Sequence, residues 1–138
     1  MKAIMERKVN SSERNTSQKL CILEFLKSTR VHPDAQTIYQ EVKKTLPSVS
    51  KGTIYRNLES MVAMGKIKLI PGKQKNFYDA DITEHAHFIC QGCGAIQDLA
   101  ISIKKILPKN KEIGIIRETD LYFFGLCKKC LINNKLNK

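Results

Sequence analysis

A short stretch of the chain concentrates side chains that bind metal ions. Residues 85–98 read His-Ala-His-Phe-Ile-Cys-Gln-Gly-Cys-Gly-Ala-Ile-Gln-Asp, which places two imidazoles, two thiols and a carboxylate close together. His85 and His87 are separated by one residue, so in an extended strand both side chains point to the same face. We therefore expect a strand here, with both imidazoles available to one metal ion.

Four of the five cysteines form two CxxC pairs. Cys90 and Cys93 make the first pair, and Cys127 and Cys130 make the second. In a cytosolic chain, two such pairs most often close a tetrahedral thiolate site of the kind that holds structural Zn(II). The segment between the pairs is longer than a usual zinc-ribbon gap and must hold structure of its own. Cys21 lies among apolar residues and is expected to pack as a small hydrophobic side chain.

The composition indicates a polyanionic partner. The 138 residues carry a formal net charge of +11, and residues 1–80 hold 15 Lys and Arg against 7 Asp and Glu. A basic N-terminal half is typical of nucleic-acid binding. No apolar run approaches the roughly 20 residues of a membrane span, and the start lacks the apolar core of a signal peptide. We therefore expect a cytoplasmic protein with reduced cysteines and no membrane partner.

Two helices are predicted at the start of the basic half. Residues 1–15 suit an extended arm or a short frayed helix, and the first full helix runs from a cap at Thr16 or Ser17 to about Ser28. The second helix is opened by His32-Pro33-Asp34-Ala35 and closed by Pro47.

The third predicted helix carries the most informative pattern. It follows a cap at Ser50 and ends at Gly65, with one apolar face formed by Ile54, Leu58, Met61 and Val62. Hydrogen-bonding and cationic side chains gather in its first two turns: Lys51, Thr53, Tyr55 and Arg56. Such a helix, following two others, is typical of the recognition helix of a winged helix-turn-helix, which lies in the major groove of DNA.

A wing and a hinge follow. Residues 66–70 and 76–79 predict two strands, and the turn between them carries Lys73 and Lys75 where they can reach a phosphate backbone. The acidic residues 80–84 form a hinge.

The remaining residues predict a small α/β unit. After the CxxC pair at Cys90, a strand is expected over 95–99 and a short helix over 101–107, followed by strands over 113–117 and 121–126. The apolar strands can pair across a two-fold axis in a homodimer. The predicted class is therefore α+β: a winged helix-turn-helix DNA-binding domain (1–79), a hinge (80–84) and an α/β dimerisation and metal-binding domain (85–138).

With these segments in place, the chain resembles the ferric uptake regulator family nearly end to end, from about Arg14 to Cys130. The resemblance rests on five segments: 32–35 (HPDA), 50–58 (SKGTIYRNL), 77–79 (FYD), 85–94 (HAHFICQGCG) and 124–130 (FGLCKKC).

The resemblance implies two metal sites. The family's structural zinc falls on the four CxxC cysteines, and its regulatory site falls on His32, Asp79, His85, His87 and Asp98. Aspartate at 79 and 98 is similar to the peroxide-sensing branch, whereas iron-uptake regulators tend to carry glutamate there. Ala86 replaces a residue of a further family metal site, which is therefore not expected. In the first helix, Arg14 and Lys19 are expected to contact DNA, although Ser17 and Lys19 stand where the family usually has proline and arginine.

Imidazoles and carboxylates together suit Fe(II), Mn(II) and similar ions. The resemblance implies a dimeric, metal-dependent repressor of an AT-rich inverted repeat, in which peroxide oxidises His32 or His85. One alternative is a metal-uptake regulator of the same family without peroxide sensing. Another is a zinc-ribbon nucleic-acid binder with no sensing function. A zinc hydrolase or deaminase is a third, but neither HExxH nor HxE followed by PCxxC occurs, so we expect no enzyme.

Overall fold

The computed structural model describes residues 11–29, 31–109 and 113–136. The chain divides into two compact units. The N-terminal unit comprises residues 1–71 and 76–82, and the C-terminal unit comprises residues 72–75 and 83–138. Within the described residues, none of the helices combines the length and the apolarity that a bilayer crossing requires.

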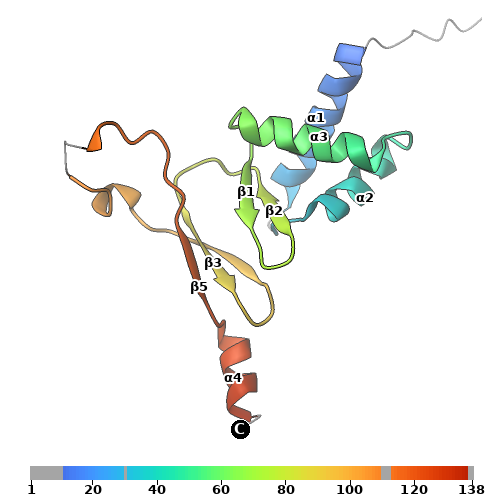
Figure 1. Ribbon diagram of the computed structural model, residues 1–138. Coiled ribbons are helices and arrows are strands. Elements are labelled where there is room, and N and C mark those ends of the chain that lie inside the picture. Colours follow the sequence, from blue (N-terminus) through green and yellow to red (C-terminus); the bar gives the residue numbers. More distant parts are fainter. Residues whose placement is uncertain (1–10, 30, 110–112, 137–138) are drawn as a thin grey trace, which may run out of the picture. The chain divides into compact units, whose positions relative to one another are not determined.

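The N-terminal unit contains three helices followed by a β-hairpin (Figure 1). The helices are α1 (Ser11–Ser28), α2 (Ala35–Thr45) and α3 (Lys51–Ala63). The hairpin pairs β1 (Lys68–Pro71) antiparallel with β2 (Asn76–Asp79). The predicted order of three helices and a wing-like hairpin is confirmed.

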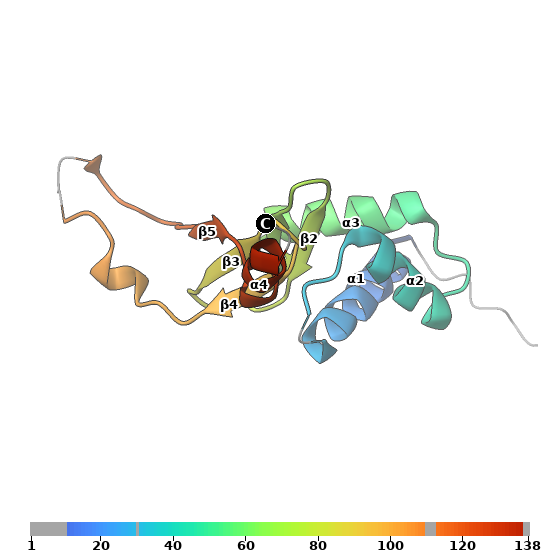
Figure 2. The same cartoon turned by 90° about the horizontal axis from the view of Figure 1, so that it is seen from below.

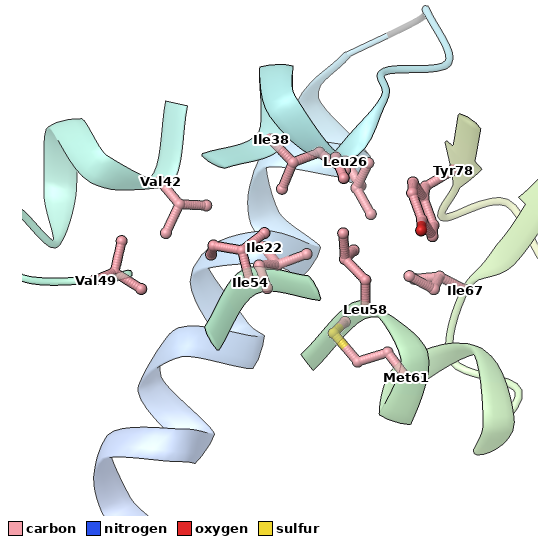
Figure 3. Close-up of a cluster of buried hydrophobic side chains, with 11 residues drawn as sticks. Ile22, Leu26, Ile38, Val42, Val49, Ile54, Leu58, Met61, Ile67 and Tyr78 are labelled. Carbon is pink, nitrogen blue, oxygen red and sulfur yellow. The ribbon is translucent and has the colours of Figure 1, made fainter. Parts of the chain in front are cut away.

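Caps and a shared core hold this unit together. The side chains of Asp34 and Ser50 accept hydrogen bonds from the backbone N–H of Thr37 and Thr53, which satisfies donors that a helix start leaves unpaired. Apolar side chains from all three helices and the hairpin meet in one cluster, in which Ile22, Ile54 and Leu58 are fully buried (Figure 3). This core fixes the orientation of α3, so the opposite side of that helix stays exposed.

One prediction for this unit was wrong. The first helix does not begin at Thr16 or Ser17 but at Ser11, and Thr16 lies inside it, where its hydroxyl donates to the Ser12 carbonyl at 3.0 Å. A serine-rich start favours caps, but serine is also tolerated within a helix. Residues 1–10 of the predicted arm lie outside the described residues.

The C-terminal unit is built on a three-stranded sheet (Figure 2). The central strand β3 (Ala86–Cys90) pairs antiparallel with β4 (Ile96–Leu99) and parallel with β5 (Tyr122–Gly125). The 3-10 turn η1 (Ile103–Lys105) follows β4, and helix α4 (Lys128–Leu136) follows β5.

Two predictions for this unit were wrong, and one helix was not predicted. The helix expected over 101–107 is only the turn η1. Residues 113–117 form no strand, since Gly114 has a φ of +93° that interrupts extended backbone and Ile115 is 85% exposed. Helix α4 was missed because its residues, Lys-Lys-Cys-Leu-Ile-Asn-Asn-Lys-Leu, lack a continuous apolar stripe and include a segment that reads as a polar tail.

Candidate metal centres and nucleic-acid interface

The four CxxC cysteines come together in the C-terminal unit. Cys90 ends β3, Cys93 lies in the turn after it, and Cys127 and Cys130 flank the start of α4. Their sulfur atoms all lie within 4.8 Å of one another, and the Cys93 and Cys127 sulfurs are 3.8 Å apart. Four thiolates bound tetrahedrally at about 2.3 Å from zinc lie about 3.8 Å from one another. The arrangement therefore fits a structural zinc ion.

Tight backbone packing holds this cysteine cluster. The turn after β3 closes through the Gly94 N–H, which donates to the Cys90 carbonyl at 2.9 Å, and Gly94 has a φ of +77° that favours glycine. A Cβ at Gly92 would lie 2.8 Å from the Cys130 sulfur. Glycine at position 92 therefore leaves room for the second CxxC pair to approach the first.

Ionisation of the cysteine cluster is strongly uneven. The Cys127 N–H donates to the Cys90 sulfur at 3.3 Å, and this hydrogen bond is the main cause that lowers the pKa of Cys90 to about 6. Hydrogen bonding to the Cys90 and Cys127 sulfurs raises the pKa of Cys130 to about 12. Adjacent thiolates repel one another, whereas a bound divalent cation stabilises all of them in the deprotonated form that metals require.

A second cluster in the C-terminal unit joins two imidazoles and a carboxylate. The pairing of β3 with β4 sets His87 opposite Asp98, and His85 lies just before β3. His87 Nε2 is 3.2 Å and His85 Nε2 is 3.5 Å from Asp98 Oδ1, and the two Nε2 atoms are 3.0 Å apart. Donors about 2.1 Å from one ion at a right angle are about 3.0 Å apart. The three side chains therefore converge as ligands of one metal ion would.

Neighbouring residues orient these imidazoles. His85 Nδ1 lies 2.7 Å from the Thr83 carbonyl, which accepts a hydrogen bond, so this contact assigns the proton to Nδ1 and leaves Nε2 with its lone pair. The His87 ring stacks on the ring of Tyr122, with centroids 6.1 Å apart. Burial is the main cause that raises the pKa of Tyr122, with the nearby Asp120 and Glu118 adding to it. No functional role was predicted for Thr83 or Tyr122 from their sequence positions.

The N-terminal unit holds the other two predicted regulatory residues as a pair. His32 Nε2 and Asp79 Oδ2 are 3.2 Å apart. Backbone contacts join the segment that carries His32 to β2. The Tyr78 backbone N–H donates to the Pro33 carbonyl at 3.0 Å, and Asp34 and Phe77 form an isolated antiparallel β-bridge. This pair is preformed by backbone contacts within its own unit.

The predicted DNA-reading residues lie on the exposed side of α3. Lys51, Tyr55 and Arg56 are exposed, and the Arg56 guanidinium donates to the Thr53 hydroxyl at 3.3 Å. Arg14 is exposed on α1, as are Lys73 and Lys75 in the turn after β1.

Two polar contacts tie α1 to α3. The Lys19 ammonium, predicted to contact DNA, donates to the Ser60 hydroxyl at 3.1 Å. The buried Asn57 donates from its side chain to Gln18 at 3.1 Å. Asn57, Gln18 and Ser60 were not singled out from the sequence. Only the position of Asn57 beside the apolar face of α3 pointed to its burial.

The chain combines an exposed recognition helix and a wing with two clusters of metal-binding side chains. These are together the features of a metal-responsive DNA-binding regulator. Residues 10–119 match the model of the ferric uptake regulator family, and the chain belongs to this family. The predicted resemblance and fold class are thereby confirmed.

The peroxide-responsive repressor PerR of Staphylococcus saprophyticus is 31% identical over 126 residues, which cover 88% of this chain and 84% of that protein. The crystal structure of a Campylobacter jejuni peroxide stress regulator matches with a TM-score of 0.71 and 34% identity, over 85% of this chain and 91% of that one. The Helicobacter pylori ferric uptake regulator shares the fold, with a TM-score of 0.69 at 21% identity, over 83% of this chain and 80% of that one.

Membership of this family settles the class of function. Its members are transcription regulators and not enzymes, and its repressors bind DNA as dimers. The chain is therefore a DNA-binding repressor of the ferric uptake regulator family, which confirms that part of the prediction.

Proposed function

We propose that this protein is a cytoplasmic, homodimeric repressor whose DNA binding requires a regulatory Fe(II) or Mn(II) ion and is relieved by peroxide. Zn(II) held by Cys90, Cys93, Cys127 and Cys130 has a structural role. An AT-rich inverted repeat is read by the side chains of α3, with backbone contacts from α1 and the wing. The DNA contacts are assigned to Arg14, Lys19, Lys51, Thr53, Tyr55, Arg56, Lys73 and Lys75.

The convergence of His85, His87 and Asp98 is the observation that carries this proposal. Their donor atoms are 3.0 to 3.5 Å apart, and donors that share one ion at about 2.1 Å are about 3.0 Å apart at a right angle and about 3.4 Å apart at a tetrahedral angle. A mixed set of imidazole and carboxylate ligands is harder than the thiolate cluster and suits Fe(II) or Mn(II). Both carboxylates of the proposed set are aspartates, as in the peroxide-sensing branch, and two relatives at 31% and 34% identity are named for peroxide.

The ligand set links the two units of the chain. His32 and Asp79 belong to the N-terminal unit, and the other three residues belong to the C-terminal unit. An ion shared by both groups restrains the DNA-reading helix relative to the dimerisation unit. It shifts the population towards the DNA-binding form only by its preferential affinity for that form. Exposed apolar side chains of the C-terminal unit, including Ile115 and Phe124, are available to the dimer contact.

Peroxide acts on the ligands themselves. Bound iron supplies the redox chemistry that reduces peroxide. The nearby imidazoles of His32 and His85 are the proposed acceptors of one oxygen atom, which leaves water as the other product. The hydrogen bond from His85 Nδ1 to the Thr83 carbonyl holds that ring at the reaction site. An oxidised imidazole is a poorer ligand, so the ion and the DNA are released.

Asp98→Asn tests the metal requirement. In gel-shift titrations with Mn(II), we expect the wild-type protein to bind its operator at least tenfold more tightly than in chelator, a coupling of about 1.4 kcal/mol or more. The variant should lose this stimulation and keep its zinc, because Asp98 is not part of the cysteine cluster. Asp120→Asn, an exposed carboxylate of the same unit, is the control. Equal stimulation in Asp98→Asn would refute the regulatory site.

Mass spectrometry tests the response to peroxide. After Fe(II) loading and exposure to peroxide, a peptide containing His32 or His85 should gain the mass of one oxygen atom, and the Mn(II)-loaded protein should not. If metal stimulation of DNA binding is intact but neither peptide gains oxygen, the protein is a metal-uptake regulator of the same family.

A further inference from the structure

Tyr122 is packed against a proposed metal ligand. Strand β5 runs parallel to β3 in a register that sets Tyr122 beside His87. The backbone N–H of His87 donates to the Leu121 carbonyl at 3.1 Å. The two rings are stacked, with an interplanar angle of 23° and centroids 6.1 Å apart. The same His87 imidazole has its Nε2 3.2 Å from Asp98 Oδ1 and 3.0 Å from His85 Nε2. The Tyr122 ring therefore lies beside the ligand set, stacked on one of its members.

The surroundings of this phenol suit one-electron oxidation. Phenols are among the side chains that lose one electron most readily, and the chain contains no tryptophan to compete. A phenol loses its proton when it loses an electron. Burial is the main cause that raises the pKa of Tyr122, and the negative charges of Asp120 and Glu118 add to it. Tyr122 is also only half-buried, so water can carry the proton away.

We propose that Tyr122 is an oxidation site of this protein, which donates an electron when peroxide is reduced at the neighbouring His85–His87–Asp98 cluster. This inference rests on the proposed iron site. With iron bound, hydrogen peroxide would take one electron from Fe(II), and one electron together with the phenolic proton from Tyr122. The O–O bond breaks, and the products are one water molecule, one hydroxide ion, Fe(III) and a Tyr122 phenoxyl radical.

This route competes with damage to the ligands. An oxidising equivalent that is consumed by Tyr122 is not available to add oxygen to His85. The phenoxyl radical can be returned to phenol by a cellular reductant such as a thiol, whereas an oxygen atom on a histidine carbon is not removed in this way. Tyr122 thereby sets how much peroxide the repressor tolerates before its ligand set is altered permanently.

Tyr122→Phe removes the hydroxyl and keeps the stacked ring. The matched control is Tyr39→Phe, because Tyr39 is also half-buried but lies on α2 of the N-terminal unit, 5.5 Å from the Lys43 ammonium. Zinc content, Mn(II) affinity and operator affinity are measured first in both variants, and their peroxide reactions are compared at equal Fe(II) occupancy. Zn(II) in place of Fe(II) supplies a redox-inactive reference.

The experiment freezes the Fe(II)-loaded full chain within a second of adding one equivalent of peroxide. Electron paramagnetic resonance should show a phenoxyl radical in the wild type and in Tyr39→Phe. The radical should be lost in Tyr122→Phe and in the zinc-loaded protein. Mass spectrometry of the same samples should show more oxygen on the His85 peptide in Tyr122→Phe than in the control.

Two outcomes overturn the inference. Histidine oxidation that is equal in all three proteins, with no radical, refutes the role of Tyr122 and leaves the proposed peroxide response standing. The absence of both the radical and histidine oxidation in the iron-loaded wild type refutes the two proposals together.

Discussion

The two units of this repressor are stabilised by different means. In the described part of the N-terminal unit, eleven buried side chains from the three helices, the hairpin and the segments that join them form one apolar cluster. In the described part of the C-terminal unit, the buried apolar residues are Ala86, Ile89, Cys90 and Ile103, while Phe123 and Phe124 of β5 and Ile115 are exposed. The N-terminal unit is organised around a hydrophobic core, and the C-terminal unit is organised around its cluster of thiols.

The difference shows which interactions supply the folding free energy of each unit. Burial of a large aliphatic side chain contributes about 1.5–3 kcal/mol, so a dense cluster suffices to fold a small helical unit. A small sheet with few buried side chains lacks that term and needs a metal or a second subunit. In the C-terminal unit the same atoms that hold the fold also neighbour the proposed regulatory ligands, since β3 carries both His87 and Cys90.

Removal of zinc should produce the largest difference in stability between the two units. Structural zinc sites of this kind contribute about 10–16 kcal/mol of binding free energy, so a strong chelator, or Cys93→Ser with Cys127→Ser, should unfold the C-terminal unit. We expect limited proteolysis to cut within residues 83–138 while a fragment containing α1 to β2 survives with its helical circular dichroism.

The opposite result is equally clear. If chelation unfolds the helices together with the sheet in one transition, the N-terminal unit is not independently stabilised and the comparison fails. Cys21→Ser is the control, because Cys21 packs against the apolar core and is not part of the cysteine cluster.

Leu58→Ala should act on the other unit. Leu58 is fully buried in the core, and truncation of such a leucine costs about 2–5 kcal/mol through lost burial and a residual cavity. Urea unfolding followed by helical circular dichroism should shift to lower urea, whereas zinc retention should stay unchanged.

Met64→Ala is the matched control for Leu58→Ala. Met64 follows α3 and is 54% exposed, so its truncation should change stability by less than about 0.5 kcal/mol. Loss of zinc in Leu58→Ala at a urea concentration that unfolds the helices would show that the units unfold as one.

The contrast between the units also explains what could be predicted from the sequence. Local signals determine the N-terminal unit: apolar residues recur at helical spacing, and Asp34, Ser50 and Gly65 mark helix ends. In the C-terminal unit these signals mislead, because the apolar residues Ile113 to Ile116 are typical of a strand but have no partner strand within the described chain. Gly114 further interrupts them with its positive φ. Strand formation there depends on contacts that a local pattern does not encode.

The candidate sites divide in the same way. The CxxC spacing predicts that the cysteines gather, because two sulfurs per pair are placed by a single turn. The pairing of His87 with Asp98 depends on the register of β3 against β4, which no local pattern encodes, and only the family resemblance placed Asp98 among the regulatory ligands. The hydrogen bond from Lys19 to Ser60 within the unit could not be predicted from the sequence, because it depends on how α1 packs on α3.

The smallest test compares one helix start in each unit. The Ser50 hydroxyl accepts from the Thr53 N–H at 3.2 Å, whereas in the part of the chain that the structure describes the Ser102 side chain makes no capping hydrogen bond at η1. Ser50→Ala should therefore destabilise the N-terminal unit by about 1 kcal/mol in urea unfolding. Ser102→Ala should change nothing measurable in the zinc-bound C-terminal unit. A unit that is held together by its metal should be insensitive to a missing helix cap. Equal effects of the two changes would instead mean that local hydrogen bonds matter as much beside the zinc cluster as beside the apolar core.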